Sequence, residues 1–152
     1  MRRTDKEITL RSEIDAVIRK ARVCRLAMLD GDGPYIIPLS FGYDGDSLYF
    51  HSARKGKKLD LLRQNPRVCF EFDVDVSVSA GEVPCKWGMA FRSVIGFGKV
   101  EFISAPEACR RALDIIMAQY SDEPSFAYQD AELERISVFK VKILEMSGKR
   151  SG

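Results

Sequence analysis

Two turns rich in aspartate and glycine divide the early part of the chain into short extended segments. The first turn, residues 30–33, follows the apolar run 23–29, and the second, residues 44–46, separates segments 35–41 and 47–52. Such turns between short apolar runs are typical of β-hairpins, because glycine adopts the positive φ that tight turns need. The pattern predicts an antiparallel meander of three strands. Pro38 lacks an amide hydrogen and therefore places the second strand at an edge or at a bulge.

The remainder of the chain alternates helical and extended patterns. Apolar spacing predicts helices over 12–21, with Ser12 as the cap, over 59–64, and from a capping box at 104–107 to about 120. Further strands are expected at 67–72, 91–102 and 136–143, with a long loop over 76–87. Gly96 and Gly98 lie on one face of the longest strand, where they permit a bend or a close approach.

These elements predict an α+β, mainly β fold: a small antiparallel barrel of about six strands with flanking helices. A length of 152 residues is that of one ordinary domain, and no linker divides the chain, so residues 1–152 are expected to form a single domain.

Charge and apolar content narrow the possible partners. The 24 basic and 22 acidic residues leave a net charge of only +2, which is too balanced for a general nucleic-acid-binding protein. No apolar run approaches the roughly 18 residues that cross a bilayer, and no secretory signal is visible. We therefore expect a cytoplasmic protein without a membrane or nucleic-acid partner. With one histidine and no CxxC pair, a metal site has little support, and the four cysteines are expected to be buried or half-buried thiols.

The most concentrated chemical feature is the segment 51–58, His-Ser-Ala-Arg-Lys-Gly-Lys-Lys. It combines a hydroxyl, four cationic side chains, a glycine that permits close backbone approach, and the start of a predicted helix with its unpaired amides. A phosphate monoester, with about −1.5 to −2 charges, is the ligand that such a set suits. The alternative is a solvated basic loop.

Two other features allow both a functional and a structural interpretation. His51 is the single histidine, and a lone imidazole is more often structural than catalytic. Arg92 and Ser93 lie in the long predicted strand near Trp87 and Phe91, where they would suit a flat heterocycle or simply border core aromatics. No Ser–His–Asp grouping, GxGxxG or GxxxxGKS motif is present, so hydrolase, Rossmann and P-loop functions lack support.

An ordered series of motifs resembles the pyridoxamine 5'-phosphate oxidase-like FMN-binding split barrels, and within them the 5-nitroimidazole resistance reductases. The resemblance covers nearly the whole chain and is carried by Pro34–Tyr43, Leu48–Ser52, Gly56–Lys58, Asn65–Glu71, Arg92–Lys99 and Glu145–Arg150. It implies a six-stranded split barrel that forms a homodimer, with FMN in clefts at the subunit interface.

The resemblance also implies roles for individual residues. The second strand of the meander would lie along the flavin ring and offer backbone groups to its polar edge, a role that falls to Ile37, Pro38, Leu39 and Ser40. The ribityl phosphate would be held by His51, Ser52, Lys57 and Lys58. Ser93, with Arg92 beside it, would contact the flavin, and His51 would face the reactive side of the site as a candidate catalytic residue.

The implied activity is that of an FMN-dependent oxidoreductase, which would pass electrons from NAD(P)H to a small electrophile such as a nitroaromatic or a quinone. The Arg-x-His element that the vitamin B6 oxidases carry near the C-terminus is absent, so oxidation of pyridoxamine phosphate itself is not expected. The substrate side of the pocket, near Trp87-Gly88-Met89, does not transfer from the family. The physiological substrate, the electron donor and the choice between FMN, a deazaflavin and haem stay open.

Two alternatives belong to other functional classes. One is a flavin- or haem-binding carrier or sensor without turnover, because a fold alone does not establish an activity. The other is a small barrel that binds single-stranded nucleic acid on its aromatic residues, which the balanced charge disfavours.

Overall fold

The computed structural model describes residues 4–123 and 126–152. Its helices are α1 (Arg11–Lys20), α2 (Lys57–Gln64), α3 (Pro106–Ala118) and α4 (Asp130–Leu133), with short 3-10 turns η1 (Thr4–Lys6) and η2 (Pro84–Lys86). Its strands are β1 (Glu7–Ile8), β2 (Cys24–Asp30), β3 (Gly33–Leu39), β4 (Gly42–Tyr43), β5 (Ser47–Ala53), β6 (Arg67–Ser79), β7 (Gly88–Ile103) and β8 (Ile136–Ser151). The predicted α+β, mainly β class is confirmed, with eight strands among the described residues in place of about six.

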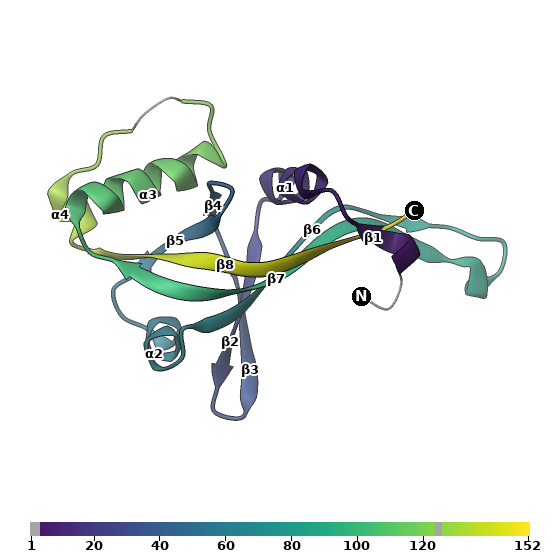
Figure 1. Cartoon of the computed structure of the whole chain (residues 1–152), viewed down its shortest axis with the longest axis horizontal. Coiled ribbons are helices and arrows are strands. Elements are labelled where there is room, and N and C mark those ends of the chain that lie inside the picture. The colour runs from purple at the N-terminus through teal and green to yellow at the C-terminus, as the bar shows by residue number, and fades with distance from the viewer. Residues whose placement is uncertain (1–3, 124–125) are drawn as a thin grey trace.

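All eight described strands belong to one antiparallel sheet with the order β3-β2-β6-β7-β8-β5-β4, and β1 pairs with β8 (Figure 1). The β2–β3 hairpin is confirmed, and Gly31 has the φ of 62° that its two-residue turn requires. Pro38 lies in β3, an edge strand of this order, as predicted.

The predicted three-strand meander is wrong in its second half. β3 and β5 do not pair and lie near opposite ends of the sheet order; β5 pairs instead with the short β4 and with β8. The cause lies after Leu39, where the chain leaves the strand to bury Phe41 and Tyr43 in the core. Burial of these aromatic rings outweighs the continuity of the hairpin pattern.

Three helices enclose the core from different sides. α1 contacts β6 and β7, α3 contacts β4 and β5, and α2 contacts β2. Figure 1 shows α1 and α3 on the same side of the sheet and α2 near the β2–β3 hairpin. The core between these elements contains five fully buried phenylalanines, Phe41, Phe50, Phe70, Phe72 and Phe139.

The helix ends differ from the sequence prediction. The N-cap of α1 is Leu10 rather than Ser12, and the N-cap of α3 is Ala105, so neither predicted side-chain cap forms. α1 is instead held at its C-terminus from a distance, because the side-chain amide of Gln119 donates to the carbonyls of Arg19 and Ala21 at 2.9 and 2.8 Å. A tertiary contact thus satisfies carbonyls at the C-terminal end of α1, although no side chain caps the N-terminus of α1 or α3.

The central strands are longer than predicted. β6 continues to Ser79 and so converts the first part of the expected 76–87 loop into strand. β6 and β7 run on together as a two-stranded arm beyond most of the sheet (Figure 1). A β-bulge interrupts their pairing between Val74 and Ser77, and Asp75 adopts a φ of 57° there.

Close approach at Gly96 is confirmed. A Cβ there would overlap the ring of Phe70, which packs directly on the glycine backbone. The cysteines follow the prediction except at one position: Cys24 and Cys109 are buried and Cys69 is half-buried, but Cys85 is exposed in η2. In the described part of the chain, no helix combines the length and apolarity that crossing a membrane requires.

Candidate functional site

The basic segment lies where β5 ends and α2 begins. We call residues 54–58 the lysine loop. Gly56 has a φ of 141° and precedes the first helical residue, a conformation that favours glycine. Leu59 and Leu62 are fully buried and fix α2 against the core. The first amides of α2 therefore stand at a fixed position beside the end of β5, and amides in a first helical turn have no acceptor within the helix.

Of the three lysines of this loop, Lys57 and Lys58 at the start of α2 have different surroundings. Lys57 pairs with Asp30 and lies over the ring of Tyr35, with 4.9 Å from Nζ to the ring centroid, so the β2–β3 hairpin holds its side chain. The hydrogen bond that Lys57 donates to the Asp30 carboxylate raises the pKa of Lys57. Lys58 is half-buried and, among the described residues, forms no hydrogen bond or ion pair, and burial lowers its pKa. Of these two lysines, Lys58 is therefore the one with spare capacity for an anionic ligand.

His51 and Ser52 precede the lysine loop on β5. Packing of the surrounding protein lowers the pKa of His51, and the positive charge of Lys58 lowers it further, although part of the ring surface stays accessible. The imidazole is thus mainly neutral at pH 7 and can both donate and accept a hydrogen bond. The Ser52 hydroxyl donates to the carbonyl of Ala53 at 3.0 Å, and its oxygen lone pairs can still accept.

The predicted ring-binding residues lie at the end of the edge strand β3 and, in the case of Ser40, directly after it. Ile37 and Leu39 turn inward and pack on the core, whereas Pro38 and Ser40 face outward and are exposed. One edge of β3 has no neighbouring strand among the described residues, so its backbone groups are available to another molecule. The Lys57–Asp30 pair joins the β2–β3 hairpin to the start of α2.

Arg92 and Ser93 lie far from this group of residues within one chain. His51 pairs with Val138 near the start of β8, whereas Arg92 pairs with Arg150 near its end. The twelve residue steps of β8 from Val138 to Arg150 extend about 40 Å at about 3.3 Å per residue. The structure therefore brings His51, Ser52, Lys57 and Lys58 together and leaves Arg92 and Ser93 at the other end of the sheet.

Arg92 and Ser93 also face opposite sides of β7. Arg92 shares a face with buried Val94, and Ser93 shares a face with exposed Ile95 and Phe97, because side chains alternate along a strand. Ser93 thus belongs to the outer face of the sheet and Arg92 to the face that carries the core. The sequence analysis treated Arg92 and Ser93 as one feature. Their side chains face opposite sides of the sheet because side chains alternate along β7.

Sequence reasoning missed two sets of residues. Asp30 and Tyr35 hold Lys57, and no local spacing links them to it. An apolar surface on the outer face of the sheet was also missed. In register across four strands, it contains Ile36, Ala27, Cys69 and Phe97. Ile36 and Phe97 are 58% and 50% exposed. The signal available in the sequence for this surface was that these strands carry apolar residues on both faces and not on the core-facing side alone.

The residues of the lysine loop fit the phosphate end of FMN. The half-buried cation Lys58 has no anionic partner among the described residues, the helix start supplies amides, and Gly56 leaves the space above its backbone open. This chemistry suits a dianion that accepts several charge-assisted hydrogen bonds.

Comparisons with known proteins agree with this fold. The family model described as pyridoxamine 5'-phosphate oxidase matches residues 10–150. A crystal structure of a candidate 5-nitroimidazole antibiotic resistance protein from Bacteroides thetaiotaomicron is 35% identical, covers 95% of this chain and 86% of that one, and has a TM-score of 0.86. An FAD-binding protein from Mesorhizobium loti is 25% identical, covers 97% and 98%, and has a TM-score of 0.69.

An uncharacterised protein of Rhizobium meliloti is 28% identical over 99 residues. That match covers 65% of this chain and 58% of the relative, so it spans less than two thirds of the relative's length. The family model, in contrast, extends over nearly the whole chain. On this match and on the 35% identity to the Bacteroides structure, the chain belongs to the pyridoxamine 5'-phosphate oxidase family.

Proposed function

We propose that this protein is an FMN-dependent oxidoreductase, formed by a single split-barrel domain, that uses electrons from NAD(P)H to reduce a small electrophile such as a nitroaromatic or a quinone. The observation that carries the proposal is Lys58, a half-buried cation without an anionic partner in the described structure, at the start of a helix. A flavin phosphate supplies the charge that this position lacks. Membership of the pyridoxamine 5'-phosphate oxidase family and a relative described as FAD-binding support a flavin ligand.

The protein's part in this function is to bind, to orient and to exclude water. Lys58 and the first amides of α2 bind the phosphate, with Ser52 as a further hydrogen-bond partner. Lys57 ties the loop to the β2–β3 hairpin through Asp30 and adds positive potential. The backbone of Ile37–Ser40 contacts the polar edge of the flavin ring. When bound, FMN supplies hydride acceptance at N5 and electron delivery to the acceptor.

His51 is proposed to act at the reactive side of the flavin. Its lowered pKa keeps the imidazole neutral under cytoplasmic conditions, so it can hydrogen-bond an acceptor without adding charge. A neutral ring beside Lys58 also avoids repulsion between two cations. The imidazole would donate a hydrogen bond to the acceptor as that molecule gains electrons.

A homodimer is part of the proposal. Because Ser93 lies about 40 Å along the sheet from the row of His51, one copy alone does not bring both residues to one flavin. A second copy, packed on the outer face, would bring its own Ser93 to the site. The clustered apolar residues of that face, Ile36, Ala27 and Phe97 among them, exceed the scattered exposure that needs no explanation. Arg25, Glu71 and Asp73 border it with charges of both signs, which suits a self-complementary twofold interface.

The test of the flavin proposal is direct. Purified protein should be yellow or should bind added FMN. Saturation at about 100 times Kd should stabilise the fold by about 2.7 kcal/mol, which a thermal melt measures. Absence of flavin absorbance together with an unchanged melting temperature contradicts it.

Turnover is tested separately by oxidation of NADH and NADPH with metronidazole or menadione as the acceptor. Reduction of bound FMN by either nicotinamide, followed by reoxidation with an acceptor, supports the oxidoreductase. Bound flavin that neither nicotinamide reduces would instead identify a carrier or sensor.

A further inference from the structure

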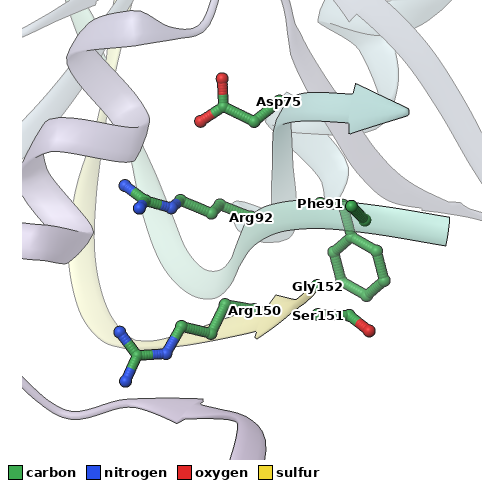
Figure 2. A pocket seen from close by; sticks show the side chains of 7 residues that line it. Asp75, Phe91, Arg92, Arg150, Ser151 and Gly152 are labelled. Atoms are coloured by element: carbon green, nitrogen blue, oxygen red, sulfur yellow. The ribbon is translucent and has the colours of Figure 1, made fainter. Parts of the chain in front are cut away.

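A second cationic site lies at the far end of the sheet, where β6, β7 and β8 meet. A cavity of about 500 Å³ is lined there by Asp75, Phe91, Arg92 and Arg150, together with Ala90 and the residues after Arg150. Figure 2 shows the Arg92 and Arg150 side chains extending in the same direction, with Arg92 between Arg150 and Asp75. The bulge in β6 and the positive φ of Asp75 bend this strand at the cavity.

The two arginines are direct cross-strand partners, which is an unfavourable arrangement without a ligand. Arg92 on β7 pairs in register with Arg150 on β8, and like charges directly opposite each other destabilise a sheet. Cross-strand neighbours lie about 4.5–5.5 Å apart at Cα, so the two guanidinium groups can reach one small anion.

The nearby acidic residues leave the positive charge of Arg92 without a partner among the described residues. Glu13 of α1 pairs with Arg150 at 3.4 Å, and Asp75 pairs with Lys20. Arg92 forms no hydrogen bond or ion pair with any described residue. Lys149, the neighbour of Arg150, lies over the Phe91 ring at 5.6 Å.

We propose that Arg92 and Arg150 form a binding site for a phosphoryl group, held by both guanidinium planes across the β7–β8 ladder. Arginine is suited to this ligand because its planar fork of N–H donors matches phosphate oxygens in bidentate geometry. The phosphoryl group belongs to free phosphate or pyrophosphate, to a flavin nucleotide, or to a nicotinamide dinucleotide. The site stands on the Arg92–Arg150 geometry and does not depend on the flavin proposal.

Binding of inorganic pyrophosphate is the first measurement, made by calorimetry at constant ionic strength. Arg92→Gln should weaken binding at least about tenfold, the effect of losing one charge-assisted hydrogen bond. Arg135→Gln is the matched control, because it removes the same charge from an exposed arginine just before β8, at the opposite end of that strand. Asp75→Asn should strengthen binding, since it removes an anion from the cavity wall while asparagine tolerates the same positive φ.

Paired ligands identify the source of the phosphoryl group. If Arg92→Gln weakens FMN binding but not riboflavin binding, the flavin nucleotide supplies it. If the variant abolishes a preference for NADP+ over NAD+, the nicotinamide dinucleotide supplies it; if only pyrophosphate binding changes, the site takes free phosphate. Equal affinities of the wild type, Arg92→Gln and Arg135→Gln for all of these ligands, or no binding of any of them, would overturn the proposal.

Discussion

Lys57 and Lys58 carry the same charge on adjacent residues, yet their surroundings give them different roles. Lys57 is exposed and held by Asp30, whereas Lys58 is half-buried and has no ion-pair partner in the described structure. A ligand phosphate competes with Asp30 for Lys57 but meets no competitor at Lys58. At the scale of the residue, affinity for the phosphate should therefore depend mainly on Lys58.

Lys58→Ala is expected to weaken FMN binding by about 1.5–3 kcal/mol, the value of one hydrogen bond to a charged group. Riboflavin, which lacks the phosphate, should bind the variant and the wild type equally. Fluorescence titration of both flavins measures the two affinities. Lys55→Gln, which removes a charge from the same loop at an exposed position, is the control. A loss of equal size in Lys55→Gln would show that only general charge matters.

The titration of His51 provides a second prediction at this scale. NMR of this single imidazole should give a pKa below the ordinary 6.5, because burial and then the charge of Lys58 disfavour the protonated ring. In Lys58→Ala the pKa should rise but stay below 6.5, since the larger cause is burial. A value at or above 6.5 in the wild type would contradict the geometry described for this site.

The lowered pKa of His51 also makes the stability of the fold depend on pH. Between the lowered pKa and 6.5 the unfolded chain binds more protons than the folded one, so the free energy of unfolding falls as the pH falls through this window. The contribution is complete above 6.5. His51→Gln should flatten this part of the pH profile in denaturant titrations, and an unchanged profile would assign the dependence to other groups.

At the scale of the element, the sequence correctly predicted the features that residues near one another in the chain determine. The Asp-Gly turn produced the β2–β3 hairpin, Pro38 marked an edge strand, and Gly96 marked a close approach. Strand partners and helix caps were predicted less well, because distant residues determine them. Burial of Phe41 separated β3 from β5, and Gln119, directly after α3, holds the C-terminal end of α1.

Gly96→Ala tests the close approach within β7. The added Cβ would overlap the ring of Phe70 and lie 2.8 Å from the carbonyl oxygen of Glu145, so the variant should lose about 1–3 kcal/mol of stability. Gly88→Ala on the same strand is the control, since nothing lies within 4 Å of its Cβ and its φ is not positive. Urea denaturation of both variants measures the difference. Equal stabilities would contradict the packing of Phe70 on this glycine.

At the scale of the whole molecule, the sequence predicted a phosphate-binding segment but not that the other candidate residues lie at the opposite end of the sheet. Segment 51–58 is local, so its chemistry was visible from spacing alone. Arg92 and Ser93 are adjacent in the chain but face opposite sides of β7, about 40 Å along the sheet from His51. Only the register of β8 with both neighbouring strands reveals this separation, on which the proposal of a second copy rests.

Ile36→Lys tests the association of two copies through the outer face. A charge at this exposed position, in register with Ala27, should convert a dimer to a monomer and weaken flavin binding with it. Sedimentation velocity measures the first effect and flavin titration the second. Leu10→Lys, at a similarly exposed residue before α1, should change neither. A dimer that survives Ile36→Lys with its flavin affinity intact would exclude this face as the interface.

The edge position of β3 has a consequence for behaviour at high concentration. An unpaired strand is a template for fibril growth, because its open N–H and C=O groups can recruit a strand from another molecule. Pro34 and Pro38 are four residues apart in β3, so both lack a donor on the same side of the strand. A strand that paired with this edge would lack a backbone hydrogen bond at both Pro34 and Pro38 within the seven residues of β3. β3 can thus expose backbone to a small molecule while it resists polymerisation.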